Sequence, residues 1–168
     1  MRILVLINII LVLGLFSCKK PQIYSPIPEI KHVSTDVSTA KDTLGNRIYK
    51  VSVRFSFVDG DGDLGLSPSD TLDDFGPGKD YYYNLKFHFF EKIDDQFIEN
   101  TNVKPYYRFQ NISKSQTTNN VLKGEMVVEI DLSATITYQD TTKFNFFIYD
   151  RGLNKSNIEE TSELRLND

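Results

Sequence analysis

Apolar and polar residues alternate along much of this chain. Apolar side chains stand at every second position in four runs, which are 49–57, 83–89, 122–132 and 144–148. An alternation with period two predicts β-strands that each bury one face. Weaker strands are expected near 30–37, 104–110 and 158–166. Apolar residues do not recur at helical spacing over a useful length and alanine is scarce, so we expect helices no longer than short turns.

Turn-forming residues separate these runs, at Gly45-Asn46, Asn119-Asn120 and Gly152. Asparagine and glycine in such positions favour reversals of the chain. Strands that follow one another without intervening helices favour antiparallel pairing. We therefore predict that residues 30–168 form one all-β domain, an antiparallel immunoglobulin-like β-sandwich of about seven strands.

The alternation of strand direction also predicts which loops lie together. If each strand reverses the direction of the one before it, the strands that end near residues 58, 110 and 150 run the same way. The loops that begin at Asp59, Asn111 and Asp150 are then expected to share one pole of the sandwich.

The first residues have the pattern of a targeting signal. Arg2 precedes an apolar run from Ile3 to Phe16, which is shorter than the roughly 20 residues that a spanning helix needs. The sequence Leu15-Phe16-Ser17-Cys18 resembles the lipobox of bacterial lipoproteins. That resemblance implies that residues 1–17 are a lipoprotein signal peptide and that Cys18 receives covalent lipid, which anchors the chain to a membrane.

Residues 18–29 are expected to be the lipidated cysteine and a tether. Pro21, Pro26 and Pro28 favour extended backbone, with a reach of roughly 30 Å. Lys19 stands where familiar sorting rules place aspartate for retention in the inner membrane. We therefore expect the outer membrane, with the periplasmic or surface face undetermined. Cys18 is the only cysteine, so stability must come from the core or from bound metal.

An acidic loop follows the first strong strand. Asp59, Asp61 and Asp63 alternate with Gly60 and Gly62, so the backbone can curl and bring the carboxylates together. Calcium prefers six to eight oxygen ligands, which such a loop can largely supply. The alternative is a tight turn, because Asp-Gly is a strong hairpin signal. A connection of about 22 residues to the next strand favours a ligand-stabilised loop.

The acidic loop resembles the calcium-binding loop of EF-hands. Its repeating aspartates and the acid at position twelve correspond to Asp59, Asp61, Asp63 and Asp70. Leu64 occupies the sixth position, where an EF-hand has glycine, and the flanking segments are not helical. The resemblance implies a calcium ion bound by these aspartates, without the opening motion of EF-hand sensors.

The distribution of charge also bears on partners. The chain has a net charge of −4, and its Lys and Arg residues are scattered. A phosphate backbone requires a clustered basic surface, so we expect no nucleic-acid partner. An acidic exported surface suits a divalent cation better.

A second motif lies near the carboxyl end. Residues 149–157 resemble the DxxGNxSN turn before the last strand of many immunoglobulin-like bacterial surface domains. Asp150 is expected to cap this turn or, if the loops share a pole, to add an oxygen to the metal. Together with the strand before the acidic loop, this motif resembles a group of small uncharacterised lipoproteins of Gram-negative bacteria that expand nutrient-uptake systems.

The middle of the chain is rich in aromatic residues. The alternation predicts that Tyr83, Leu85, Phe87 and Phe89 are buried in the core. Tyr82 and Phe90 fall on the opposite face, and Phe75 lies in the long loop. Tyr82, Phe90 and Phe75 form a possible surface for stacking on a sugar or a peptide.

No catalytic motif stands out. His32 and His88 have no nucleophile motif nearby, and metalloprotease, hydrolase-elbow and phosphate-loop signatures are absent from the sequence. We expect a non-enzymatic binding or accessory lipoprotein of the cell envelope. The alternatives are a structural or adhesion component that docks to another envelope protein and, third, a carboxylate-dependent glycan hydrolase.

Overall fold

The computed structural model describes residues 23–112 and 121–166. The predicted signal peptide, Cys18 and the first part of the tether lie outside the described residues. Within the described residues, no helix is both long enough and apolar enough to cross a membrane.

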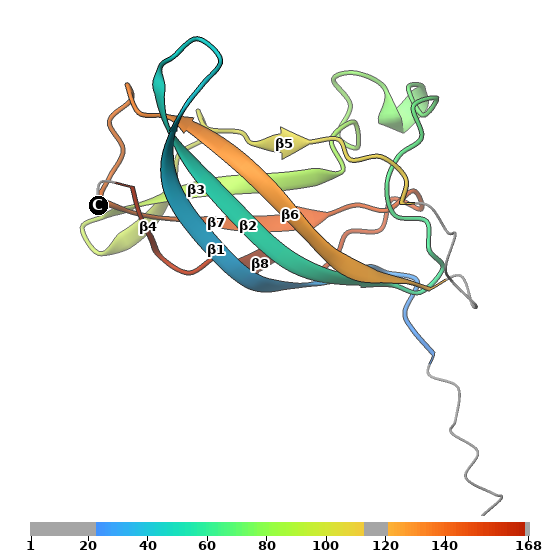
Figure 1. The fold of residues 1–168 in the computed structure, drawn as a ribbon. Coiled ribbons are helices and arrows are strands. Elements are labelled where there is room, and N and C mark those ends of the chain that lie inside the picture. Colours follow the sequence, from blue (N-terminus) through green and yellow to red (C-terminus); the bar gives the residue numbers. More distant parts are fainter. Residues whose placement is uncertain (1–22, 113–120, 167–168) are drawn as a thin grey trace, which may run out of the picture.

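The domain is all-β and consists of two antiparallel sheets (Figure 1). The first sheet has the order β1 (Glu29–Lys41), β2 (Arg47–Asp59) and β6 (Leu122–Ser133). The second has the order β4 (Gln96–Glu99), β3 (Leu85–Ile93), β7 (Thr141–Ile148) and β8 (Glu159–Glu160). Two further short strands extend the second sheet, where β5 (Tyr106–Tyr107) pairs with β3 and β9 (Leu164–Arg165) pairs with β7.

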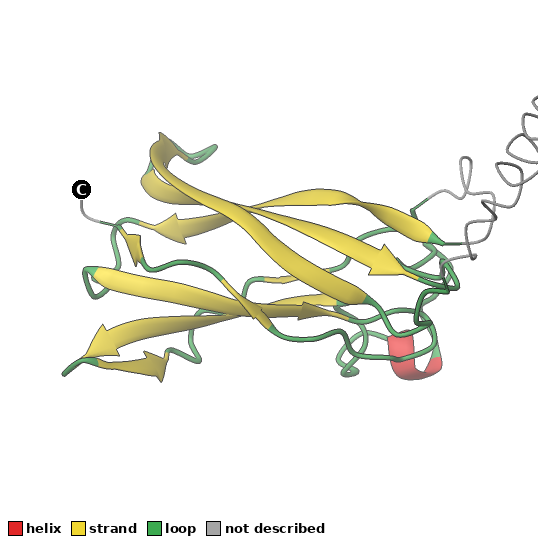
Figure 2. Cartoon of the chain, turned by 90° about the horizontal axis from the view of Figure 1, so that it is seen from below, coloured by secondary structure: helices red, strands yellow, loops and turns green. Residues whose placement is uncertain are grey.

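Short elements account for the difference from the expected strand count. The described part of the chain contains nine strands, and β5, β8 and β9 have two residues each. The single helical element there is the 3-10 helix η2 (Asp73–Phe75), which lies at one end of the molecule (Figure 2). The prediction of short helical turns is therefore confirmed for the described residues.

The inward faces of both sheets meet in one aromatic core. Phe87 of β3 stacks on its neighbour Phe146 of β7, with ring centroids 5.1 Å apart. Phe55 from β2, in the other sheet, packs on the same Phe146 ring at 5.2 Å. All three side chains are fully buried, and each such burial contributes roughly 1.5–3 kcal/mol. The period-two runs therefore supply the two faces of the core, as predicted.

The prediction that Tyr83 is buried in the core is wrong. Its side chain is 40% exposed, whereas the neighbouring Asn84 is buried. Strand β3 begins only at Leu85. Before it, the Asn84 side chain pairs with the backbone of Phe109 in both directions, with distances of 2.9 and 3.1 Å. This pairing fixes which way the chain enters β3, and it leaves Tyr83 on the outside.

Truncation of the central ring tests the shared core. We expect Phe146→Ala to lower the free energy of unfolding by about 3–5 kcal/mol, because it removes a ring that contacts both sheets and leaves a cavity. Val127→Ala is the control, since Val127 is 47% exposed and its truncation should cost less than about 0.5 kcal/mol. Denaturant unfolding measures both values. Equal losses of unfolding free energy for the two variants would contradict a core shared by both sheets.

Candidate functional site

Three loops meet at one end of the domain, as the strand directions predict. Leu64, in the acidic loop after β2, forms a β-bridge with Asp150 after β7. Leu66 forms a second bridge with Gln110. The backbone amide of Ile112 also donates to the carbonyl of Leu64 at 3.4 Å. The loops that begin at Asp59, Asn111 and Asp150 therefore share one end, which we call the acidic pole.

Two glycines permit the tight path of the acidic loop. The amide of Gly60 donates to the carbonyl of Ser25 at 2.9 Å, and a Cβ atom at Gly60 would lie 2.3 Å from that oxygen. Gly65 has a φ of +87°, and a Cβ atom there would lie 2.3 Å from the carbonyl oxygen of Gln110. Any side chain at either position would push the neighbouring backbone away.

Three carboxylates converge in this loop. Asp59, Asp61 and Asp63 each offer an oxygen, and these oxygens lie within 4.8 Å of one another. Asp59 has no exposed surface. Its Oδ2 accepts hydrogen bonds from the backbone amides of Asp63 at 2.9 Å and Leu64 at 3.2 Å. Oδ1 of Asp59 and Oδ1 of Asp63 are buried and have no hydrogen-bond partner among the described residues.

The electrostatics of the acidic pole are unfavourable without a cation. Burial raises the pKa of Asp59 to about 7, and the charges of Asp61 and Asp63 add to the shift. Burial also raises the pKa of Asp63, with further contributions from Asp150 and Asp61. Unpaired buried carboxylates are costly, and a cation with oxygen ligands relieves both the repulsion and the missing contacts.

Asp150 caps its own turn and also lies beside the three carboxylates. Its Oδ1 accepts from the backbone amide of Asn154 at 2.8 Å and its Oδ2 from the side-chain amide at 2.9 Å. A Cβ atom at Gly152 would lie 3.3 Å from Oδ1 of Asp150 and 3.6 Å from Oδ2 of Asp63. Burial raises the pKa of Asp150 as well. Asp150 can therefore cap its own turn and also lie beside the three carboxylates.

Asp70 does not join this group. Its Oδ2 accepts from the backbone amide of Ser67 at 2.7 Å, and its Oδ1 forms an ion pair with Arg151 at 3.3 Å. The backbone carbonyl of Asp70 also accepts from Arg108. The structure therefore brings three of the four predicted ligands together and places the fourth in an ion pair with a basic residue.

The three residues of the predicted aromatic surface do not line one groove. Phe90 lines a groove on the outer face of β3 and β7, whereas the residues lining that groove do not include Tyr82 or Phe75. The Tyr82 ring lies under the guanidinium of Arg108, 5.2 Å from its centroid. Phe75 ends η2 and is half-buried.

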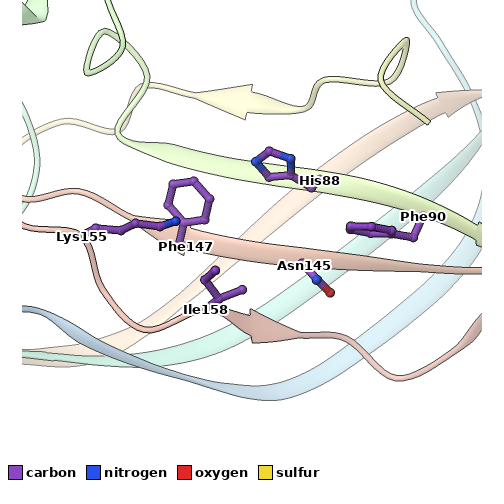
Figure 3. Close-up of a pocket in the computed structure, with 6 residues that line it drawn as sticks. All are labelled: His88, Phe90, Asn145, Phe147, Lys155 and Ile158. Carbon is purple, nitrogen blue, oxygen red and sulfur yellow. The ribbon is translucent and has the colours of Figure 1, made fainter. Parts of the chain in front are cut away.

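The groove contains residues that the sequence analysis did not select. The lining residues other than Phe90 are His88, Asn145, Phe147, Lys155 and Ile158 (Figure 3). Phe147 was detectable, because it places an aromatic ring at an outward position of the 144–148 run. Lys155 was not detectable, since only the folded loop after β7 carries it to this face.

Comparisons with protein-family models, curated proteins and solved structures found no match for this chain. The chemistry of the acidic pole and of the groove is therefore the basis on which a function can be assigned.

A pair of glycine variants tests the packing of the acidic pole. Gly45 and Gly65 have φ values of +86° and +87°, but a Cβ atom at Gly45 would meet nothing within 4 Å. Both Gly→Ala variants incur about 1–2 kcal/mol of left-handed strain. Gly65→Ala should lose about 1–3 kcal/mol more, because it also displaces the backbone of Gln110. Chemical denaturation of both variants measures the difference, and equal stabilities would refute this packing.

Proposed function

We propose that the protein is an exported, lipid-anchored, non-enzymatic binding domain with an immunoglobulin-like β-sandwich fold, stabilised by calcium at the acidic pole. One observation carries the calcium proposal. Asp59 is fully buried, and its Oδ1 has no partner among the described residues although two other carboxylates lie within reach. A buried carboxylate oxygen in such surroundings is suited to a metal ion.

The donor set favours calcium over other common cations. Asp59, Asp61 and Asp63 would hold the ion through oxygen, with Asp150 beside them. Calcium accepts irregular shells of oxygen ligands, whereas magnesium requires a nearly octahedral shell and retains its water. The group contains no cysteine or histidine, and these are the ligands that zinc prefers.

A cation here would stabilise the contact between the two sheets. Asp59 is the last residue of β2 in the first sheet. The carbonyl of Asp63 accepts from the amide of Arg151, in the loop that follows β7 of the second sheet. An ion that binds only the folded state adds about 2.7 kcal/mol of stability when its concentration is 100 times its Kd.

The proposed anchor lies only a few residues before a segment that contacts the acidic loop. Ser25 contacts Gly60 in the acidic loop, and the Tyr24 ring lies 3.5 Å from Nζ of Lys123. The stretch from Cys18 to Tyr24 reaches at most about 20 Å when fully extended. Lipid on Cys18 would therefore hold the acidic pole near the membrane, for which we propose the outer membrane.

A docking role is the second candidate. Strand β6 is an outer strand of its sheet and has 12 residues. Val127, near its middle, is 47% exposed. Long edge strands can pair with a strand of another protein. Stoichiometric crosslinking to one envelope protein through β6 would favour this role over small-ligand binding.

Thermal unfolding tests the calcium proposal. We expect millimolar calcium to raise the Tm of the purified domain by several degrees relative to EDTA, because the ion neutralises the converging carboxylates. Asp61→Asn should abolish the rise. Asp36→Asn is the matched control, since it removes an exposed carboxylate on β1 and should leave the rise intact. Identical melting curves in calcium and EDTA would overturn the proposal.

Metabolic labelling tests the lipid anchor. The full chain expressed in a Gram-negative host should incorporate a labelled palmitate analogue and fractionate with outer membranes. Cys18→Ser should lose the label, because the thiol is the acylated group. Incorporation of equal label by Cys18→Ser would exclude this attachment site. Protease treatment of intact cells then distinguishes a surface-facing domain from a periplasmic one.

A further inference from the structure

The groove on the outer face of the second sheet is a separate feature from the acidic pole. It lies over β3 and β7, beside the segment 155–158, and encloses about 300 Å³ (Figure 3). That volume is at the lower end of the range for small-ligand sites. His88 of β3 faces Asn145 of β7 across the ladder, so the centre of the groove is built on paired strands.

Flat rings form the floor of the groove. The His88 ring stacks on Phe147 with centroids 5.7 Å apart and an angle of 27° between the planes. Phe90 continues the surface along β3, and Ile158 borders it with 56% of its surface exposed. Flat rings next to exposed apolar groups suit a ligand with a flat, weakly polar face.

Three polar groups lie in or beside this floor. Oδ1 of Asn145 is buried and has no hydrogen-bond partner among the described residues. Nδ1 of His88 is held by the carboxylate of Glu99 at 2.7 Å, which orients the ring and leaves Nε2 for another partner. Nζ of Lys155 lies 3.7 Å from the Phe147 ring centroid. The groove therefore offers an amide, an imidazole and an ammonium group.

Two lysines lie near the Phe147 end of the groove, because Lys86 lies 5.6 Å from the Tyr149 ring centroid and Tyr149 packs edge-on against Phe147. Burial lowers the pKa of Lys86, the charge of Asp80 opposes that shift, and the charge of Lys155 adds to it. Lys86 donates to the backbone carbonyl of Asp80 at 2.6 Å. Within the described part of the chain, neither lysine has a carboxylate oxygen within 4.0 Å. An anionic group on a ligand would compensate the charge of Lys155.

We propose that this groove binds an acidic saccharide, with a sugar ring against Phe90 and Ile158 and its carboxylate at Lys155. The sugar hydroxyls meet Asn145 and His88. A peptide that adds a strand to a sheet needs a free edge, whereas the backbones of β3 and β7 already pair with each other here. The inference rests on the proposed binding role and does not require calcium.

Calorimetric titration of the purified domain tests the proposal. The probes are short oligosaccharides of galacturonate, glucuronate and mannuronate, each compared with its carboxyl-reduced neutral counterpart. At least one acidic probe should bind about tenfold more tightly than its neutral counterpart. Lys155→Gln should remove this preference. Phe90→Ala should weaken binding of the acidic probe by about tenfold or more, because it removes an apolar contact.

A matched control distinguishes binding at this groove from nonspecific attraction between charges. Lys41→Gln removes the same charge from an exposed residue at the end of β1, and it should leave the affinity unchanged. The proposal is overturned if no acidic probe binds, if acidic and neutral probes bind equally, or if Lys41→Gln and Lys155→Gln have the same effect. Unaltered melting temperatures establish that each variant is folded.

The two proposals can fail separately. Asp61→Asn should retain saccharide binding below its melting temperature while losing the response to calcium. A calcium response without saccharide binding would overturn only the groove proposal, whereas the opposite result would overturn only the calcium proposal.

Discussion

The burial of Asp59 is the constraint on which the acidic pole depends. This carboxylate is the last residue of β2 and has no exposed surface. One of its oxygens orders the following loop by accepting the amides of Asp63 and Leu64. The other has no partner among the described residues. A charge in this position is costly unless it is compensated, so the proposed cation would have a structural role at the end of the core.

The loop after β7 links the two proposed sites. Asp150 approaches the acidic cluster and holds Asn154 through both of its oxygens. The next residue, Lys155, forms a β-bridge with Tyr149 and lines the groove. One turn therefore contributes a carboxylate to the pole and an ammonium group to the outer face. The aromatic core beneath holds β3 and β7 in register, which fixes the geometry of the groove.

Much of the fold follows from local sequence patterns, and the exceptions have physical causes. Strands β2, β3, β6 and β7 fall on the four alternating runs because each buries one face. Strand β4 was not predicted, since its four residues are too few for a periodic signal. Tyr83 lies outside because the Asn84 pairing with Phe109 sets the start of β3. That contact joins residues 25 positions apart, so no local pattern encodes it.

The two proposed sites also depend partly on local sequence and partly on tertiary contacts. By itself the sequence determined the convergence of Asp59, Asp61 and Asp63, because their spacing and the glycines between them act within a single loop. Only the tertiary structure decided that Asp70 pairs with Arg151 and that Asp150 lies beside the cluster. It also decided that β3, β7 and the loop carrying Lys155 form one groove. These arrangements depend on strand register and loop packing between distant segments, which the alternation of residues along one strand does not specify.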